Sequence, residues 1–231
     1  MSMFVLLVQS AMFMYVHLVR SVNNNSKNKR FGEIQTFYFY FKGGIKVMNY
    51  EKVLIGISGS IGAVEIHSYL TEIQNRFNCS INIIMTESAK RIVNPDSLKY
   101  FIDGYIFENM FDANSDFKIP HVHLPNWADV LIILPATANI IGKIANGIAD
   151  DLLSTTAMAA ACPVVIVPNT NEHMYNRQAV QRNIQALKED SYIFIEPEGE
   201  GVQLSTKKKI KGAMPSPKEL VSQLEGMILH A

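Results

Sequence analysis

The feature that most constrains the fold is a short apolar run that turns directly into a helical pattern. Residues 130–134 are rich in branched side chains and end at Pro135, which is typical of a buried parallel strand. Isoleucines then recur at helical spacing from Ile140 onward. We expect this helix to continue through Thr156 and the small residues after it as far as Ala161.

The residues that join this strand to its helix suit a cofactor. Ala136 and Ala138 are small enough for a flat ring to approach the backbone, and Thr137 and Asn139 can hydrogen-bond its rim. A strand that ends in small polar residues and leads into a helix N-terminus is the usual crevice for an anionic or planar cofactor. An ordinary turn with an asparagine near the helix cap is the alternative interpretation.

The same order of strand and helix recurs along the chain. Further apolar runs predict strands at residues 53–57, 81–85, 164–167 and 192–195. Helical patterns follow at residues 64–73, 94–101 and 176–189, and a closing helix starts at residue 216. Strands that alternate with helices predict an α/β fold, a doubly wound (Rossmann/flavodoxin-like) parallel sheet with helices on both faces in a single domain.

Three segments interrupt this alternation. Residues 104–117 are predicted to form a surface segment, and residues 169–175 a loop. Residues 196–217 are polar and contain glycines, which predicts a mobile flap.

Composition and charge exclude several classes of protein. The 231 residues are enough for a sizeable core. Basic and acidic residues both number 21, so nothing indicates a nucleic-acid surface, and the cluster around Lys208 is expected to be a solvated loop. The two cysteines, Cys79 and Cys162, have no metal-like spacing, and such low cysteine usage favours a reducing cytoplasm.

Residues 1–47 look foreign to the rest of the chain. Residues 3–19 are largely apolar but interrupted by polar side chains, and they lack the flanks of a signal peptide. A membrane anchor, an extra packed segment and upstream sequence read from a start codon set too early are the three interpretations. We favour the last, because Met48 stands just before the first regular strand, and we place the domain at residues 48–231.

A Gly/Ser turn follows the strand at residues 53–57. Its glycines let backbone N–H groups face a ligand, and its serines add hydroxyl donors. Thr86 and Ser88, which follow the next strand, can join Ser58 and Ser60 around one phosphate. Helix capping is the alternative role for Thr86 and Ser88. The turn lacks the full G-x-G-x-x-G dinucleotide pattern and is a weak signal by itself.

Two histidines precede the strand at residues 130–134. At positions i and i+2, His121 and His123 are predicted to share one side of an extended segment. A metal site needs a third ligand, and none stands at a telling spacing. We therefore expect surface or packing histidines and no metal.

Four blocks carry a resemblance to a known family when they are taken in order. They read GISGSIGA at 56–63, MTESA at 85–89, HVHLPNWAD at 121–129 leading into PATAN and KIANG, and PNTNEHMY at 168–175. Together they resemble the homo-oligomeric flavin-containing cysteine decarboxylases, over about residues 50–190.

The resemblance implies a flavin mononucleotide, with the flavin dinucleotide as the alternative. It implies phosphate contacts from the serine and threonine hydroxyls and ring or ribityl contacts near Thr137. The residues implied to hold the cofactor are Ser58, Gly59, Ser60, Ile61, Thr86, Ser88, Pro135, Ala136, Thr137, Ala138 and Asn139.

The resemblance also implies the catalytic residues. The active-site histidine falls on His121, which stands six residues before Trp127, so that His123 is a bystander. The substrate-binding asparagine falls on Asn171, with Met174 beside the substrate. Thr170 replaces a common methionine and is expected to alter the substrate pocket. Asp151 replaces a common asparagine and is expected to alter a flavin contact.

Two enzyme types in this family begin with the same oxidation. Phosphopantothenoylcysteine decarboxylase, on the coenzyme A pathway, uses a cysteine in a later flap, whereas no cysteine follows Cys162 here. The sequence most resembles the peptidyl-cysteine decarboxylases of lanthipeptide biosynthesis, of the mersacidin and epidermin type. They convert the C-terminal cysteine of a precursor peptide to an aminoenethiol, which then forms an aminovinyl-cysteine ring.

Two other members of the family remain as alternatives. A non-catalytic flavin-binding regulator is one, but the long acidic tail of such proteins is lacking in this chain. A flavin prenyltransferase is the other, and the blocks around His121 and Asn171 count against it. The family further implies a trimer or dodecamer with the flavin at a subunit interface, and we expect neither a nucleic-acid nor a membrane partner.

Overall fold

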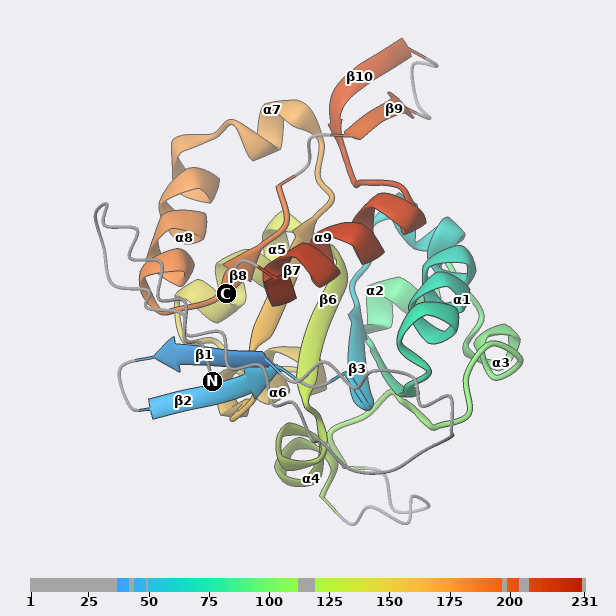
Figure 1. The fold of residues 1–231 in the computed structure, drawn as a ribbon. Helices are drawn as coiled ribbons and strands as arrows, with labels where there is room; N and C mark the ends of the chain where they lie inside the picture. Colours follow the sequence, from blue (N-terminus) through green and yellow to red (C-terminus); the bar gives the residue numbers. More distant parts are fainter. Residues whose placement is uncertain are drawn as a thin grey trace, which may run out of the picture.

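The computed structural model describes residues 37–41, 44–48, 50–111, 119–196, 199–203 and 208–229. This part of the chain centres on a six-stranded sheet in the order β5-β4-β3-β6-β7-β8, with every neighbouring pair parallel (Figure 1). Its strands are β3 (Lys52–Ile57), β4 (Ser80–Met85), β5 (Ile106–Phe107), β6 (Val130–Ala136), β7 (Val164–Pro168) and β8 (Ile193–Phe194). The predicted doubly wound parallel sheet is confirmed, because this order extends outward in both directions from β3 and β6.

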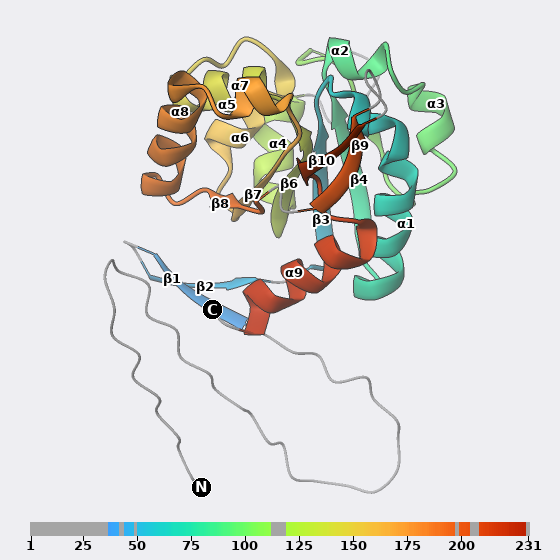
Figure 2. The same cartoon turned by 90° about the horizontal axis from the view of Figure 1, so that it is seen from above.

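Helices cover both faces of the sheet. They are η1 (Ile61–Glu65), α1 (Ile66–Phe77), α2 (Glu87–Lys90), α3 (Pro95–Leu98), α4 (Pro120–Trp127), α5 (Ala138–Ala145), α6 (Leu152–Ala159), α7 (Glu172–Tyr175), α8 (Gln178–Glu189) and α9 (Pro217–Leu229). Helices α1 and α9 lie on one face, and α4, α5, α6 and α8 lie on the other (Figure 2).

Successive side chains of β3 belong alternately to the two hydrophobic cores, one on each face of the sheet. Ile55 packs with the core of α1 and α9, whereas its neighbour Leu54 packs with the core of α4, α5 and α6. Both side chains are fully buried. Successive side chains of a strand point to opposite faces, so a continuous apolar run is what a strand covered on both faces requires.

The expectation of one helix running to Ala161 is wrong. Helix α5 ends at Ala145, and Gly147 adopts a positive φ of 69°, a conformation that favours glycine. A new helix, α6, then begins behind Asp151, whose side chain and that of Ser154 form a reciprocal capping box. Ile148 therefore lies outside both helices and is 45% exposed.

Several short or polar segments contain helices and strands that the sequence did not predict. The segment 104–117 contains β5, a two-residue strand, and the expected loop at 169–175 contains α7. The expected flap at 196–217 contains an antiparallel hairpin of β9 (Gly199–Gln203) and β10 (Lys208–Ala213). The helix expected at 94–101 is shorter, since α3 covers only Pro95–Leu98. With only two to four residues, β5, α3 and α7 are too short for a periodic pattern. Strands β9 and β10 are longer, but their sequences, GEGVQ and KKIKGA, contain no apolar run.

The N-terminal extension contributes a second hairpin. Strands β1 (Phe37–Phe41) and β2 (Gly44–Met48) pair in antiparallel fashion. The apolar residues 3–19 lie outside the described residues, so the three interpretations of this extension and the start at Met48 stay predictions. Among the helices that the structure describes, none combines the length and apolar character needed to cross a membrane.

Candidate functional site

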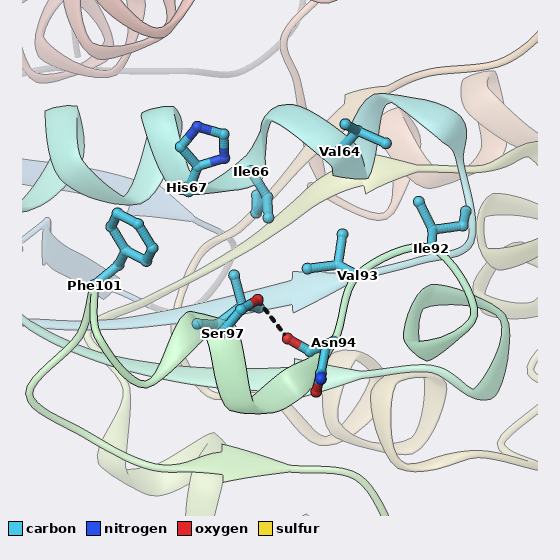
Figure 3. A pocket seen from close by; sticks show the side chains of 9 residues that line it. Val64, Ile66, His67, Ile92, Val93, Asn94, Ser97 and Phe101 are labelled. Atoms are coloured by element: carbon cyan, nitrogen blue, oxygen red, sulfur yellow. Dashed lines mark hydrogen bonds between the residues drawn. The ribbon is translucent and has the colours of Figure 1, made fainter.

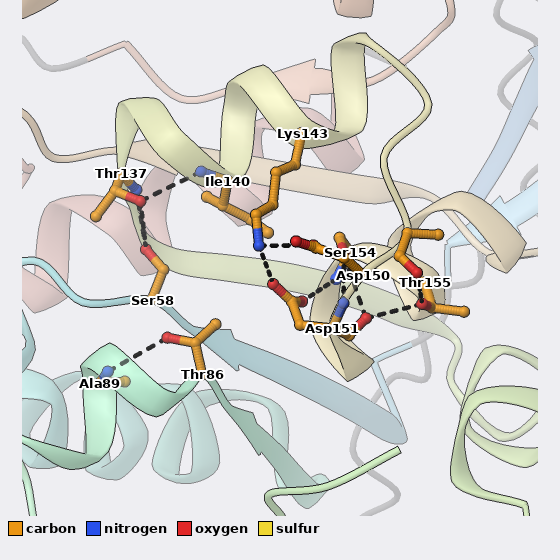
Figure 4. A network of polar contacts seen from close by, with 11 residues as sticks. Ser58, Thr86, Ala89, Thr137, Ile140, Lys143, Asp150, Asp151, Ser154 and Thr155 are labelled. Atoms are coloured by element: carbon orange, nitrogen blue, oxygen red, sulfur yellow. Dashed lines mark hydrogen bonds and ion pairs between the residues drawn. The ribbon is translucent and has the colours of Figure 1, made fainter.

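The site is built where β3 and β6 end side by side. A ligand in a sheet of this order binds outside the carboxyl ends of the strands, at the point where the strand order reverses. Ser58 is buried there, and its Oγ donates to the Pro135 carbonyl at 2.7 Å. The same Oγ accepts the N–H of Thr137, which lies beside it in Figure 4, at 2.9 Å. One hydroxyl thus connects the predicted phosphate turn with the predicted ring-binding residues.

The turn after β3 also lies against α2, the helix that follows β4. A Cβ at Gly59 would collide with the Cβ of Ser88, so only glycine allows this approach. Thr86 caps α2 by accepting the Ala89 N–H at 3.3 Å, as the capping interpretation predicted. The Ser60 and Ser88 side chains remain partly or fully exposed. The structure therefore gathers the predicted hydroxyl groups from two strand ends at one edge.

The residues after β6 form the floor of this edge. Pro135 and Ala136 are buried, and Thr137 caps α5 by accepting the Ile140 N–H at 3.3 Å. Ala138 and Asn139 open α5, with Asn139 exposed. Small residues below and hydroxyl groups beside them fit a flat ring that carries a phosphate, so this edge suits a flavin. Ile61, which opens η1, is 57% exposed beside it.

Asp151 acquires a structural role beside this floor. Lys143 Nζ lies 2.7 Å from Asp151 Oδ2 and 2.6 Å from Asp150 Oδ1, while Asp151 Oδ1 accepts the Ser154 N–H at 2.8 Å (Figure 4). Burial by itself raises the pKa of Asp151, but the hydrogen bonds from Lys143 and Ser154 outweigh it and hold the pKa below its usual value. The Asp151 carboxylate, which stands where asparagine is common in the family, is therefore charged near neutral pH and is bonded to Lys143 and Ser154.

The predicted substrate residues lie one strand further along the same edge. Asn171 follows β7 and caps α7, where its Oδ1 accepts the His173 N–H at 2.9 Å. Met174 is 52% exposed on α7. Because Ala136 pairs with Pro168, this loop lies directly beside the residues that follow β6.

The hairpin segment is anchored at this edge by both of its ends. At one end, Tyr175 Oη donates to Glu196 Oε2 at 2.6 Å. Burial and this carboxylate together raise the pKa of Tyr175, so the phenol stays protonated. At the other end Met214 is buried, and a Cβ at Gly62 would lie only 2.8 Å from its Cε.

His121 lies away from this edge. It stands on α4, which precedes β6, whereas the predicted cofactor edge, made by the residues that follow β3 and β6, lies beyond the end of β6. The two therefore lie at opposite ends of this strand (Figure 1). The expectation of an extended segment is wrong because Pro120 starts a helix, and residues two apart on a helix point in different directions. His121 Nδ1 is buried without a hydrogen-bond partner among the described residues, and the Phe111 ring meets the imidazole edge-on at 6.0 Å between centroids.

Sequence reasoning missed one residue of the site. Asn169 follows β7, and its backbone N–H donates to the Ala136 carbonyl at 2.8 Å. Its side-chain oxygen contacts Ser60 Oγ. The sequence could have indicated Asn169, because it is the first residue after a strand that ends at Pro168, just as Thr137 is the first residue after β6.

Comparison with known proteins identifies the family. The Flavoprotein family matches residues 46–229. The chain belongs to this family. Mersacidin decarboxylase of Bacillus sp. (strain HIL-Y85/54728) is 39% identical over 153 residues, which are 66% of this chain and 77% of that protein.

Two further relatives of this flavoprotein are linked by their names to different compounds, coenzyme A and a peptide. The coenzyme A biosynthesis bifunctional protein CoaBC of Bacillus subtilis (strain 168) is 41% identical over 179 residues, which are 78% of this chain and only 43% of that protein. A solved EpiD variant in complex with the substrate peptide DSYTC is 30% identical, with a TM-score of 0.66, and the match covers 75% of this chain and 97% of EpiD. The expectations of a flavin-binding protein and of an enzyme are confirmed by the family and by relatives that are named decarboxylases.

A separate hollow of about 390 Å³ lies between η1 and α1 on one side and α3 on the other (Figure 3). Its wall contains Val64, His67 and Phe101, and none of the predicted site residues lines it. Two of its polar side chains cap α3, since Ser97 Oγ donates to the Asn94 carbonyl at 2.7 Å and Asn94 Oδ1 accepts the Asp96 N–H at 3.0 Å. The strand ends, rather than this hollow, are therefore the candidate site.

Proposed function

We propose that this flavoprotein oxidatively decarboxylates the C-terminal cysteine of a lanthipeptide precursor and releases an aminoenethiol for aminovinyl-cysteine formation. The observation that carries the proposal is the composition of the hairpin segment at the site. Residues 196–217 contain no cysteine, although Met214 places this segment against the turn that follows β3. The flap thiol implied for phosphopantothenoylcysteine decarboxylases therefore has no counterpart in this segment.

Flavin mononucleotide is the proposed cofactor. Ser60 and Ser88 would hold its phosphate beside the Gly59 backbone, and Ala136 to Asn139 would contact its ring and ribityl chain. Ser58 supports both groups from below through Pro135 and Thr137. The mononucleotide fits the absence of the full dinucleotide glycine pattern in the sequence.

The chemistry assigns distinct tasks to the protein side chains. The bound flavin would accept a hydride from the cysteine Cβ, which leaves a thioaldehyde whose C=S group can take up the electrons of the carboxylate as CO2 departs. His121 removes the thiol proton as the hydride leaves, since imidazole is a suitable base near neutral pH. Asn171 donates an amide N–H to the substrate carboxylate and accepts the substrate amide N–H, which fixes the orientation of the substrate.

A neighbouring copy of the chain would supply His121. The distance between α4 and the cofactor edge within one chain, at opposite ends of β6, supports this arrangement. So do the exposed apolar side chains around His121, with Phe111 80%, Ile119 49% and Val122 54% exposed. Apolar groups gathered in this way are typical of an interface. A trimer or dodecamer, as the family resemblance implies, would bring His121 to the flavin of its neighbour.

The identity with CoaBC favours one alternative substrate, phosphopantothenoylcysteine. The two reactions differ in their electron balance. Peptidyl-cysteine decarboxylation removes two electrons from the substrate for good, whereas phosphopantothenoylcysteine decarboxylation returns them when the enethiol is reduced to a thiol. Without air, a peptide ending in cysteine should therefore bleach the yellow protein permanently, in proportion to the peptide added.

The same experiment with phosphopantothenoylcysteine completes the comparison. Under the proposal this substrate either leaves the colour unchanged or bleaches it permanently. Turnover of phosphopantothenoylcysteine with recovery of the yellow colour, together with no response to the peptides, would reject the proposal in favour of the coenzyme A reaction. Peptides that end in serine are the matched control and should leave the colour unchanged.

A further inference from the structure

Asn169 contacts both the end of β6 and the turn that follows β3. Its backbone is held by the Ala136 carbonyl, and its side chain contacts Ser60 Oγ. A Cβ at Gly62 would lie 2.9 Å from Asn169 Oδ1 and 2.8 Å from Met214 Cε. The carboxamide is therefore packed between the phosphate turn and the base of the hairpin, where it has little freedom to move away from Ser60.

The contact with Asn169 decides whether the Ser60 hydroxyl can donate its hydrogen to a ligand. A serine hydroxyl has a single hydrogen but can accept two hydrogen bonds. When Ser60 donates to Asn169 Oδ1, no hydrogen remains for a phosphate oxygen. A carboxamide also carries an NH2 group, and a half-turn of the side chain presents Nδ2 in place of Oδ1. In that arrangement Asn169 donates to Ser60 Oγ, and the hydrogen of Ser60 points to the anion.

We propose that Asn169 is a positioning residue for the flavin phosphate: its amide donates to Ser60 Oγ so that Ser60 donates to the phosphate. The inference rests on the proposed flavin site and is independent of the proposed peptide substrate. A donor of this kind polarises the hydroxyl and strengthens its hydrogen bond to a charged acceptor. Asn169 also stands two residues before Asn171, so one short loop orients both cofactor and substrate.

Riboflavin provides the test, because it carries the same ring and ribityl chain without the phosphate. The dissociation constants of FMN and of riboflavin are measured by fluorescence quenching on flavin-free full-length protein. Asn169→Ala should weaken FMN by about fivefold to fiftyfold and leave riboflavin within about twofold. Asn169→Asp should weaken FMN further, since a carboxylate accepts the Ser60 hydrogen and repels the phosphate. Asn75→Ala, at an exposed position on α1, is the matched control and should change neither constant.

A double-mutant cycle shows whether Asn169 acts through Ser60. In a Ser60→Ala background, Asn169→Ala should weaken FMN by less than about twofold, because the hydroxyl that it orients is gone. Equal losses for FMN and riboflavin would overturn the inference and leave Asn169 with a packing role only. Fully additive losses in the cycle would overturn it as well.

Two outcomes separate this inference from the proposals on which it is built. A wild-type protein that bound FMN no tighter than riboflavin would overturn both the phosphate site and the role of Asn169. A protein that discriminated FMN from riboflavin through Asn169 but left every cysteine peptide unchanged would overturn only the proposed function.

Discussion

Removal of the Ser58 hydroxyl should destabilise the protein although the change is a single oxygen atom. Ser58 is 2% exposed, and its Oγ accepts the Thr137 N–H while donating to the Pro135 carbonyl. In Ser58→Ala both hydrogen bonds are lost, and alanine provides no acceptor in their place. Thr137 is the N-cap residue of α5, so the lost hydrogen bonds are those that join the end of β3 to the end of β6.

The magnitude follows from these contacts. A buried polar group left without its partner costs about 1–3 kcal/mol of the free energy of unfolding. In a domain of this size, each kcal/mol lowers the melting temperature by about 2–4 °C. We therefore expect Ser58→Ala to melt about 4–8 °C below the wild type, for a loss of about 2 kcal/mol.

Thermal unfolding of flavin-free protein, followed by circular dichroism, measures this difference without a contribution from bound cofactor. Ser68→Ala is the matched control, because Ser68 is exposed on α1 and its loss should change the free energy by less than about 0.5 kcal/mol. A Ser58→Ala variant that melts together with the Ser68→Ala variant would refute the claim that this hydroxyl connects β3 and β6.

Three further predictions concern the site itself. Gly59→Ala should weaken FMN binding at least about tenfold, because its Cβ would collide with Ser88 on α2. Gly226→Ala, whose Cβ meets nothing, should leave the affinity unchanged, and equal affinities in the two variants would contradict the packing at Gly59. Asp151→Asn should lower the free energy of unfolding at about pH 7. Because folding depresses the pKa of Asp151, the difference in free energy of unfolding between wild type and variant should disappear as the pH falls below the ordinary pKa of 3.8 and through the lower pKa of the folded protein. A difference that stayed constant with pH would exclude the ion pair as its cause. His121→Asn should keep the yellow colour and lose turnover, while His123→Asn should keep both; activity in the first variant would remove His121 from the role of base.

The core of the fold was predictable because burial on two faces leaves a strong pattern. Continuous apolar runs located β3, β4, β6 and β7 closely, and the start of a helix after Pro135 was also predicted. The serine and threonine positions were also predictable, since carboxyl ends of parallel strands meet at one edge of a sheet.

The remainder depends on contacts between residues distant in sequence. The break between α5 and α6 is fixed by Gly147 and by the cap at Asp151, and each competes with an apolar pattern that continues through them. The role of Asn169 depends on Ser60, 109 residues away in the chain. The separation of His121 from the cofactor edge depends on which end of β6 it precedes, and residue spacing alone does not reveal it.

The most direct test of the central claim is mass spectrometry of short peptides ending in cysteine after incubation with the yellow protein. These peptides should lose about 46 Da, the mass of CO2 and two hydrogens, and matched peptides ending in serine should lose nothing. A loss of about 44 Da from phosphopantothenoylcysteine, with the cysteine peptides unchanged, would contradict this prediction and move the protein to coenzyme A biosynthesis.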